Sequence, residues 1–437
     1  MKNSKYNVIF EHDGKKFAFN GISCVLAEVS NNFLSFLKNI PQIKETLLNE
    51  EDRNLLRAMK KGGYILEDDI NELSLIKFRN YSGKFCRNTF FLTIAPTLSC
   101  NFSCPYCYEK FKTGFMSDDV QDAICNQIEL AAKSNQYISI IWYGGEPTLA
   151  SNIISELSQK IISICEKYNV GYTAAMTSNG YLIDSNFIDL MKKWKINSAQ
   201  ITLDGPKDIH NSRRKLTNGE GTFDVLLCNI KQLKVNGIEV SIRVNITKEN
   251  ENYFGHLLDT LVENNLQDCH ILMAKVVPYD TCLSDVASKC LDDIRWSRKV
   301  IEYSALLSEK GFYASKNPYR PIKRTNYCYA DNINSFIVDP TGSLYKCWTD
   351  LGNTNRSIGN ILNFKNENIH SINDISADYI FWSPFDHKEC LECKVLPLCM
   401  GGCPKRGLMK KNVECSPLKY NLIENLKLLC ATENVSR

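Results

Sequence analysis

The feature that most constrains the fold of this sequence is a regular alternation of strand and helix patterns between residues 89 and 310. Apolar runs typical of buried strands occur six times, at Phe90–Ile94, Tyr137–Tyr143, Gly171–Thr177, Ser198–Leu203, Glu239–Ile246 and Cys269–Val277. Helical patterns lie between them, at Ser117–Ser134, Asn152–Tyr168, Ser185–Trp194, Thr222–Val235 and Asn252–Asn264, and a last one runs from Ser284 to Glu309. Six strand–helix units predict an α/β domain built on a parallel sheet. Their spacing leaves two forms open, a doubly wound sheet and a sheet curved into a partial barrel.

Three closely spaced cysteines follow the first of these strands. Cys100, Cys104 and Cys107 have the spacing C-x3-C-x2-C, on the loop that leaves the strand. Three thiols at this spacing converge readily on one metal centre, and thiolates are natural ligands of iron–sulfur clusters and of zinc. A four-iron cluster with three protein ligands keeps one iron open, so this stretch predicts a site of chemistry. A zinc knuckle is the alternative that the spacing leaves open.

A second group of cysteines lies near the C-terminal end. The chain has 19 cysteines, an excess that favours metal ligands over disulfides in a reducing compartment. Seven of them follow one another at Cys328, Cys347, Cys390, Cys393, Cys399, Cys403 and Cys415. The runs Asn334–Val338 and Ser343–Lys346, separated by Asp339-Pro340-Thr341-Gly342, predict a hairpin that leads into Cys347.

Short polar motifs stand where the next strands end. After the second strand come Gly144, Gly145 and Glu146. The two glycines allow the backbone to approach a ligand closely, and the carboxylate can accept hydrogen bonds from an ammonium group. Ser178 and Thr202 follow the third and fourth strands with hydroxyls suited to a ribose. In α/β folds the carboxyl ends of the strands are where ligands bind.

Composition narrows the function classes. The net charge is +3, and 44% of the residues are hydrophobic and 23% charged, as in an ordinary globular protein. Without a long basic run, nucleic acid is not the expected partner. No apolar run approaches the roughly 18 residues of a membrane span, and the first residues lack the apolar core of a signal peptide. We therefore expect a cytoplasmic protein with no membrane partner.

Residues 1–85 predict a small separate module. Two strand patterns, at Tyr6–Phe10 and Lys16–Asn20, are followed by helical patterns at Phe33–Leu37, Glu51–Lys60 and Asp69–Lys77. This order is typical of a winged-helix-like fold, and Tyr81–Lys84 serves as the expected linker to the barrel. An exposed strand edge in such a module can pair with an extended peptide by β-augmentation. A structural cap on the barrel is the other reading of the same residues.

The motifs together resemble those of the radical S-adenosylmethionine (SAM) enzymes that carry a C-terminal SPASM domain. The C-x3-C-x2-C spacing with Tyr106 before the last cysteine, and Gly144-Gly145-Glu146-Pro147 about forty residues later, match the family signature. The resemblance implies a partial (β/α)6 barrel, with a cluster on Cys100, Cys104 and Cys107 whose open iron is chelated by SAM. It also implies SAM contacts from Tyr106, Gly144, Gly145, Glu146, Ser178, Thr202 and Arg214. Arg243 is the rival of Arg214 for the SAM carboxylate.

The seven later cysteines match the SPASM pattern and imply two auxiliary four-iron clusters. The outer one is expected on Cys390, Cys393, Cys399 and Cys415, and the inner one on Cys328, Cys347 and Cys403. Because no cysteine lies in residues 316–327, the fourth inner ligand is left open. Either that cluster keeps an open iron, or Cys282 or Cys290 completes it. The expected domains are 1–85 for peptide recognition, 86–312 for the barrel and 313–437 for SPASM.

Three functions are weighed. The first is a maturase that abstracts hydrogen from a ribosomally made precursor peptide, docked on the N-terminal module, and closes a thioether or carbon–carbon cross-link. It would receive electrons from a flavodoxin or ferredoxin. The second is an anaerobic sulfatase-maturating enzyme, which makes formylglycine. Those enzymes generally begin at the barrel and carry an aspartate directly after the cysteine that matches Cys347, where this chain has Trp348 and, two residues on, Asp350. The third is a non-enzymatic zinc-binding interaction protein.

Overall fold

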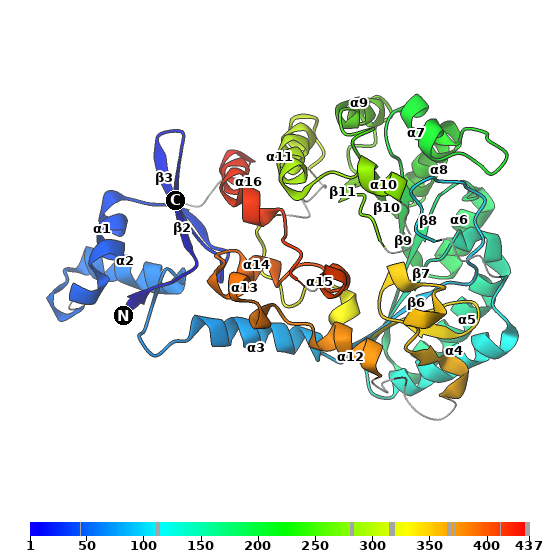
Figure 1. Ribbon diagram of the computed structural model, residues 1–437, viewed down its shortest axis with the longest axis horizontal. Coiled ribbons are helices and arrows are strands. Elements are labelled where there is room, and N and C mark those ends of the chain that lie inside the picture. The colour runs from blue at the N-terminus through cyan, green and yellow to red at the C-terminus, as the bar shows by residue number, and fades with distance from the viewer. Residues whose placement is uncertain are drawn as a thin grey trace. The chain divides into compact units, whose positions relative to one another are not determined.

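The computed structural model describes residues 1–43, 45–109, 114–279, 284–313, 320–364, 369, 373–410 and 412–432. The chain forms two compact units (Figure 1). The first comprises Met1–Lys84, Tyr319–Cys328 and Trp382–Arg437, and the second comprises Phe85–Pro318 and Tyr329–Phe381. The three-domain division at residues 85 and 312 stays a prediction.

The second unit is built on a parallel sheet whose strands follow one another in chain order. These strands are β6 (Thr89–Ile94), β7 (Tyr137–Trp142), β8 (Gly171–Ser178), β9 (Ile196–Thr202), β10 (Glu239–Ile246) and β11 (His270–Lys275). A doubly wound sheet reverses its strand order at a switch point, whereas this order runs one way from β6 to β11. The order therefore decides between the two forms that the sequence left open, and the expected partial barrel is confirmed.

Helices alternate with these strands and cover the outside of the sheet (Figure 1). They are α4 (Asp118–Ala132), α5 (Ser151–Tyr168), α6 (Ser185–Lys193), α7 (Lys207–Arg213), α8 (Phe223–Val235), α9 (Phe254–Glu263), α10 (Ser284–Lys289) and α11 (Asp293–Glu309). The single helix expected at 284–309 is two helices, because the Asp292 side chain caps the N-terminus of α11 by accepting from the Arg295 amide at 2.7 Å. Among the described helices, none has the length and apolar character needed to cross a membrane.

The expected hairpin is confirmed, and it extends the barrel sheet. Strand β12 (Ser335–Val338) pairs with β6 in parallel and with β13 (Ser343–Tyr345) in antiparallel, and β14 (Gly359–Asn360) adds a last short strand. The amide of the buried Asn334 donates to the Thr89 carbonyl at 2.7 Å and thereby joins the start of β12 to β6. Helix α12 (Asp374–Phe381) completes this unit.

The first unit combines N-terminal and C-terminal segments. Its N-terminal elements are β1 (Lys2–Asn3), β2 (Asn7–His12), β3 (Lys15–Asn20), β4 (Leu26–Glu28), α1 (Asn31–Asn39), α2 (Glu50–Lys61), β5 (Ile65–Leu66) and α3 (Glu72–Lys84). Its C-terminal helices are α13 (Lys388–Glu392), α14 (Leu396–Cys399), α15 (Pro404–Lys410) and α16 (Leu418–Thr432). Strands β2, β3 and β4 form an antiparallel sheet, and β1 pairs with β5.

The linker expected at Tyr81–Lys84 is wrong, because helix α3 continues through these residues. The Lys84 side chain is only 1% exposed and donates to the carbonyl of Trp382, and Asn80 donates to the carbonyl of Thr325 at 3.0 Å. These bonds bury the last turns of α3 against later parts of the first unit. A polar Tyr-Ser-Gly-Lys stretch is typical of a linker only where no distant backbone groups, such as the carbonyls of Trp382 and Thr325, bind the helix that contains it.

Asn20, at the end of β3, is the polar centre of the N-terminal elements. Its amide donates to Ser4, Asn7 and the Gly63 carbonyl at 2.8–2.9 Å, and its carbonyl oxygen accepts from two backbone amides at 3.0 Å. The residue is fully buried. It ties strand β3 to both ends of the N-terminal segment.

We expect Asn20→Ala to destabilise this region by about 3 kcal/mol, because several buried groups lose their partner at once. Native-state hydrogen exchange in β3 should report the loss. Asn39→Ala is the matched control, since the Asn39 amide makes one exposed bond of 3.4 Å to Ser35. Equal exchange rates in the two variants would contradict the central role of Asn20.

Candidate active site at the strand ends

The loop carrying Cys100, Cys104 and Cys107 leaves the C-terminal end of β6 and is held in place by backbone bonds. The Ser103 amide donates to the Lys215 carbonyl, and the Thr217 amide donates to the Asn101 carbonyl, both at 3.0 Å. Partial burial raises the pKa of the Cys100 thiol to about 11. Metal binding therefore has to displace a proton from this thiol.

Gly144 and Gly145 bring the end of β7 against the root of this loop. A Cβ atom on Gly144 would lie 2.3 Å from the Thr97 carbonyl oxygen, and one on Gly145 would lie 2.4 Å from the carbonyl oxygens of Leu98 and Ser99. Gly144 also has a φ of +118°, which side chains disfavour. The glycines are thus required by contact with the cysteine-bearing segment, while their contact with a ligand stays a prediction.

Glu146 lies fully buried behind this contact and binds the neighbouring strand ends together. Its carboxylate accepts from the Thr148 amide and hydroxyl, from the Ser178 hydroxyl at 2.7 Å and from the Asn179 amide at 2.6 Å. Burial raises the pKa of Glu146, and these hydrogen bonds oppose the rise. Asn179 in turn donates to Asn101 at 2.7 Å, which connects the end of β8 to the cysteine loop.

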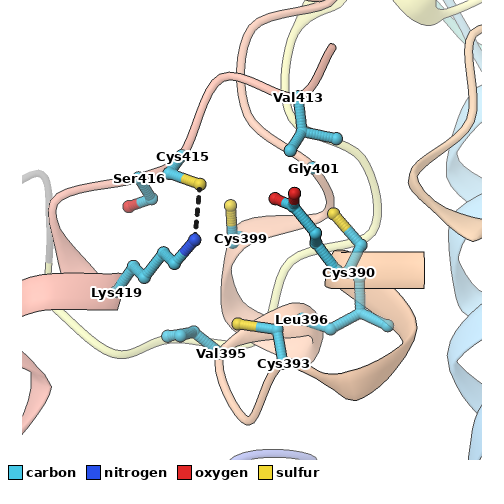
Figure 2. Close-up of a pocket in the computed structure, with 11 residues that line it drawn as sticks. Cys390, Cys393, Val395, Leu396, Cys399, Gly401, Val413, Cys415, Ser416 and Lys419 are labelled. Carbon is cyan, nitrogen blue, oxygen red and sulfur yellow. Dashed lines mark hydrogen bonds between the residues drawn. The ribbon is translucent and has the colours of Figure 1, made fainter. Parts of the chain in front are cut away.

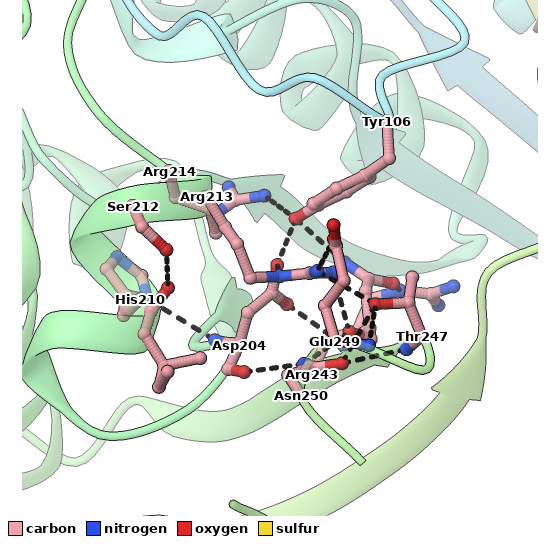
Figure 3. A network of polar contacts seen from close by, with 12 residues as sticks. Tyr106, Asp204, His210, Ser212, Arg213, Arg214, Arg243, Thr247, Glu249 and Asn250 are labelled. Atoms are coloured by element: carbon pink, nitrogen blue, oxygen red, sulfur yellow. Dashed lines mark hydrogen bonds and ion pairs between the residues drawn. The ribbon is translucent and has the colours of Figure 1, made fainter. Parts of the chain in front are cut away.

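A buried polar network around Asp204 fills the ends of β9 and β10 (Figure 3). Asp204 accepts from the Tyr106 hydroxyl, from Nε of Arg213 at 3.4 Å and from the Asn245 amide at 3.0 Å. The Arg213 guanidinium also contacts Glu249 at 3.2 Å and lies over the Tyr106 ring. Tyr106, the aromatic residue of the cysteine motif, is therefore fixed by its hydroxyl as well as by its backbone.

The Arg214 guanidinium lies buried at these strand ends and is only partly hydrogen-bonded among the described residues. Its Nη1 donates to the Tyr106 hydroxyl at 2.9 Å, but its buried Nε has no hydrogen-bond partner among the described residues. Its charge acts on Cys100 and Cys104. A buried guanidinium with an unpaired donor beside three thiols fits an anionic ligand bound there. The donor set thus fits a thiolate-held cluster with a carboxylate-bearing cofactor.

The other predicted contacts lie on the same strand ends. Thr202 is 7% exposed at the end of β9 and is paired in register with Arg243 of β10. Arg243 donates from Nε to the Asn245 side chain at 2.9 Å. Asn245 lies 3.5 Å from the Tyr106 hydroxyl through its amide nitrogen, so Arg243 belongs to the same polar network.

An aromatic cluster near the cysteine loop was not expected from the sequence. Tyr108 and Tyr143 share a hydroxyl–hydroxyl bond, and Tyr143 packs on Trp348 with ring centroids 4.5 Å apart. Burial raises the pKa of Glu109 to about 8, although a hydrogen bond with Tyr143 partly opposes this rise. The sequence feature that could have indicated this cluster is the position of Tyr108 and Glu109 directly after Cys107. Trp348 is brought to the cluster by the hairpin that joins β6, a long-range pairing.

Asp350 is held in a structural role. It is 1% exposed, accepts from the Tyr379 hydroxyl at 2.6 Å and lies 3.7 Å from Arg356. Trp348, which follows Cys347, points its indole nitrogen to Thr93 at 3.3 Å. The position after Cys347 thus carries an indole against β6.

Four of the predicted cluster ligands line one pocket in the first unit. Figure 2 shows the sulfur atoms of Cys390, Cys393, Cys399 and Cys415 around this pocket, with Lys419 beside them. The ammonium of Lys419 donates to the Cys415 sulfur at 3.4 Å. Across the described residues, no three Cys, His, Asp or Glu side chains lie close enough to share a single metal ion. A four-iron cluster asks for a wider spacing, because each thiolate binds a different iron.

The remaining predicted ligands fall in both units. Cys328 and Cys403 belong to the first unit and Cys347 to the second. Cys282 lies outside the described residues, and the Cys290 sulfur lies 3.1 Å from the Val286 carbonyl. The inner cluster and its fourth ligand stay predictions.

The network around Asp204 can be tested by isosteric substitution. We expect Asp204→Asn to cost about 3 kcal/mol, because it leaves the buried Arg213 without its buried counter-charge. Glu249→Gln should cost less than about 1 kcal/mol, since the Glu249 side chain is 47% exposed. Hydrogen exchange of the Asn245 amide measures both variants. Wild-type exchange in Asp204→Asn would show that the network does not hold β9 to β10.

Comparison with known proteins finds a matching family model and several similar proteins. The Radical SAM superfamily model matches residues 94–261. A cysteine-type anaerobic sulfatase-maturating enzyme of Clostridium perfringens is 26% identical over 76% of this chain and 92% of that protein. An uncharacterized Synechocystis protein is 29% identical, but the match spans only 46% of its length and 40% of this chain.

Solved structures agree with the fold. The structure of native anSMEcpe with bound AdoMet and the Cp18Cys peptide has a TM-score of 0.60 and 19% identity, covering 79% of this chain and 100% of that one. The structure of Streptococcus suis SuiB bound to precursor peptide SuiA has a TM-score of 0.54 and 16% identity, covering 95% and 97%. The expected α/β fold of the radical SAM type, with small N-terminal sheets and a C-terminal extension, is confirmed. The family implies SAM and a [4Fe-4S] cluster. Residues 94–261 of this chain are thus similar to the Radical SAM superfamily.

Proposed function

We propose that this enzyme modifies a ribosomally made precursor peptide by abstracting hydrogen from one of its residues and closing an intramolecular thioether or carbon–carbon cross-link. The observation that carries the proposal is the extent of the likeness to SuiB, which covers 95% of this chain and includes a precursor peptide in that structure. The likeness to anSMEcpe covers less of this chain, 79%. The N-terminal module is the part that a peptide-docking enzyme needs in addition.

The reactive cluster is assigned to Cys100, Cys104 and Cys107, and SAM to the surrounding strand ends. When bound, this pair supplies a 5′-deoxyadenosyl radical. Arg214, with its unpaired buried Nε, is the residue that best fits the SAM carboxylate. Arg243 remains the alternative. Gly144, Gly145, Glu146, Ser178, Thr202 and Tyr106 are the other proposed contacts.

The chain's own residues give this site rigidity and keep water out. Glu146 and Asp204 are 0% and 1% exposed, and through charge-assisted hydrogen bonds they join the end of β7 to β8 and the end of β9 to β10. Placement within a fraction of an ångström matters because a radical abstracts whichever hydrogen is nearest. The Tyr108, Tyr143 and Trp348 rings provide an apolar surface beside the cysteine loop, suited to shielding a substrate radical from solvent.

Docking of the peptide is assigned to the free edge of β4. Within the described chain this strand pairs only with β3, so its other edge has unpaired backbone groups. Val25, the residue before β4, is 38% exposed and offers an apolar contact to an added strand. Main-chain pairing of this kind gives affinity for an extended segment of varied sequence. The auxiliary clusters on the seven later cysteines, and a flavodoxin or ferredoxin as electron donor, belong to the same proposal.

Formylglycine formation on a sulfatase is the second candidate. The 26% identity to the Clostridium perfringens enzyme over most of both chains favours it. Two observations argue against this candidate. The residue after Cys347 is Trp348, whose ring contacts Tyr143. The nearby Asp350 is buried and accepts a hydrogen bond from Tyr379. A buried, hydrogen-bonded carboxylate is poorly placed to take a proton from a substrate.

Iron analysis tests the cluster assignment. Anaerobically reconstituted protein should bind about twelve irons if three four-iron clusters form. The triple variant Cys100→Ala, Cys104→Ala, Cys107→Ala should retain about eight and lose release of 5′-deoxyadenosine, because no iron is left to chelate SAM. A variant that still cleaves SAM would move the reactive site elsewhere.

Mass spectrometry separates the two functions. The enzyme should be co-expressed with the peptide encoded by a neighbouring short reading frame and, in parallel, with a sulfatase-type peptide containing cysteine. Cross-linking removes two hydrogens per link from the precursor peptide. Formylglycine formation instead replaces the cysteine sulfur with an aldehyde oxygen. Loss of sulfur from the sulfatase peptide, with the precursor unchanged, would reject the cross-linking proposal in favour of the second candidate.

A further inference from the structure

The N-terminal sheet is buried on both of its faces, and the C-terminal cysteine segment covers one of them. Ala18 of β3 packs with Phe33, Phe36 and other residues of α1 and α2. On the opposite face, Phe10, Phe17 and Phe19 pack with a different set, Val395, Leu398, Leu418 and Leu426. These three phenylalanines are 6%, 5% and 1% exposed. An isolated winged-helix-like module would leave all three rings in water.

Two of the covering residues stand between the outer cysteines, and the other two lie in α16, just after Cys415. Val395 and Leu398 lie in the stretch from Cys393 to Cys399, and Val395 also lines the cysteine pocket. Cys393 itself packs against the phenylalanine cluster. The same short segment therefore provides metal ligands on one side and the cover of the N-terminal sheet on the other.

A second contact joins this segment to α3 and to the start of β2. Tyr6 and Ile76 share an apolar cluster with Cys390, Leu396 and Met400. The Lys5 ammonium donates to the Leu391 carbonyl at 2.6 Å, and Lys394 donates to the Asn7 carbonyl at 3.1 Å. The residues that directly follow Cys390 and Cys393 are thus bonded to residues near the start of the sequence.

The segment has little secondary structure to hold it in this shape. Helix α13 has five residues and α14 has four, far below the length at which a helix is stable alone. Met400, Gly401 and Gly402 follow with φ values of +49°, +86° and +77°. A backbone of short turns that carries four thiols is stabilised chiefly by what the thiols bind, because metal binding in such segments is coupled to folding.

We propose that the outer four-cysteine site is the folding centre of the peptide-docking module, so that its occupancy determines whether the sheet β2–β3–β4 and helix α3 are formed. The inference rests on the proposed outer cluster, and it assigns that cluster a structural role in substrate docking. Without the cluster, the segment around Cys393 and Cys399 loses its shape, and Phe10, Phe17 and Phe19 lose their cover. Each ring buries on the order of 150 Å² or more, so the module loses a large part of its core.

Hydrogen exchange on the full-length protein tests this inference. The variant Cys393→Ala, Cys399→Ala should lose about four irons. Exchange in β2, β3 and α3 should then accelerate at least tenfold, while β6–β11 keep wild-type protection. Wild-type protein stripped of iron by a chelator should show the same acceleration, which excludes a defect of the substitutions themselves.

Two matched controls sharpen the result. Cys430→Ala changes a cysteine that packs in the same phenylalanine cluster and is outside the ligand set, and it should keep both iron and protection. The triple variant at Cys100, Cys104 and Cys107 should lose about four irons without any change in β2 and β3. Unchanged protection of β2, β3 and α3 after loss of the outer irons would overturn the inference. Full iron retention in Cys393→Ala, Cys399→Ala would reject the outer site itself, and the inference with it.

Discussion

The close backbone approach at Gly144 and Gly145 is the constraint on which the strand-end site depends. With side chains at these positions, the carbonyls of Thr97, Leu98 and Ser99 would be displaced. Those carbonyls immediately precede the cysteine loop, and Glu146 behind them connects β7 to the end of β8. The start of the loop that carries the three thiols is therefore held in position by backbone contact. Preorganisation of this kind lets a protein place a reactive group without reorganising at the moment of reaction.

Two adjacent buried arginines in this region, Arg213 and Arg214, have different hydrogen-bond partners. Asp204 and Arg213 form a buried ion pair, and both side chains make further hydrogen bonds to residues at the end of β10. Arg214, the next residue, is also buried but keeps an unpaired donor near the thiols. Two adjacent arginines thus differ in role, because α7 ends between them and directs their side chains to different partners. Arg213 is paired within the barrel, whereas Arg214 keeps a buried donor that has no partner among the described residues.

Much of the barrel was predictable from the sequence, because its strands are apolar runs with helices of regular period between them. The observed strand order decided between two forms that spacing alone could not separate. Sequence patterns also located the strand-end motifs around Cys100 and Glu146. They missed the aromatic cluster with Trp348 and the true length of α3, since both depend on residues far away in the chain. Lys84 reads as part of a linker until Trp382 supplies its buried partner. Local sequence carries no signal for such a contact.

The discontinuous first unit has a consequence for how the chain is made. Phe10, Phe17 and Phe19 are synthesised about 400 residues before Leu418 and Leu426, which cover them. Sequence separations of about 400 residues give this core a very high contact order, and such cores close slowly. Until they close, an apolar sheet with open edges is exposed to other nascent chains. Low yield or co-aggregation on overexpression should then respond to translation speed and chaperone supply rather than to changes within the barrel.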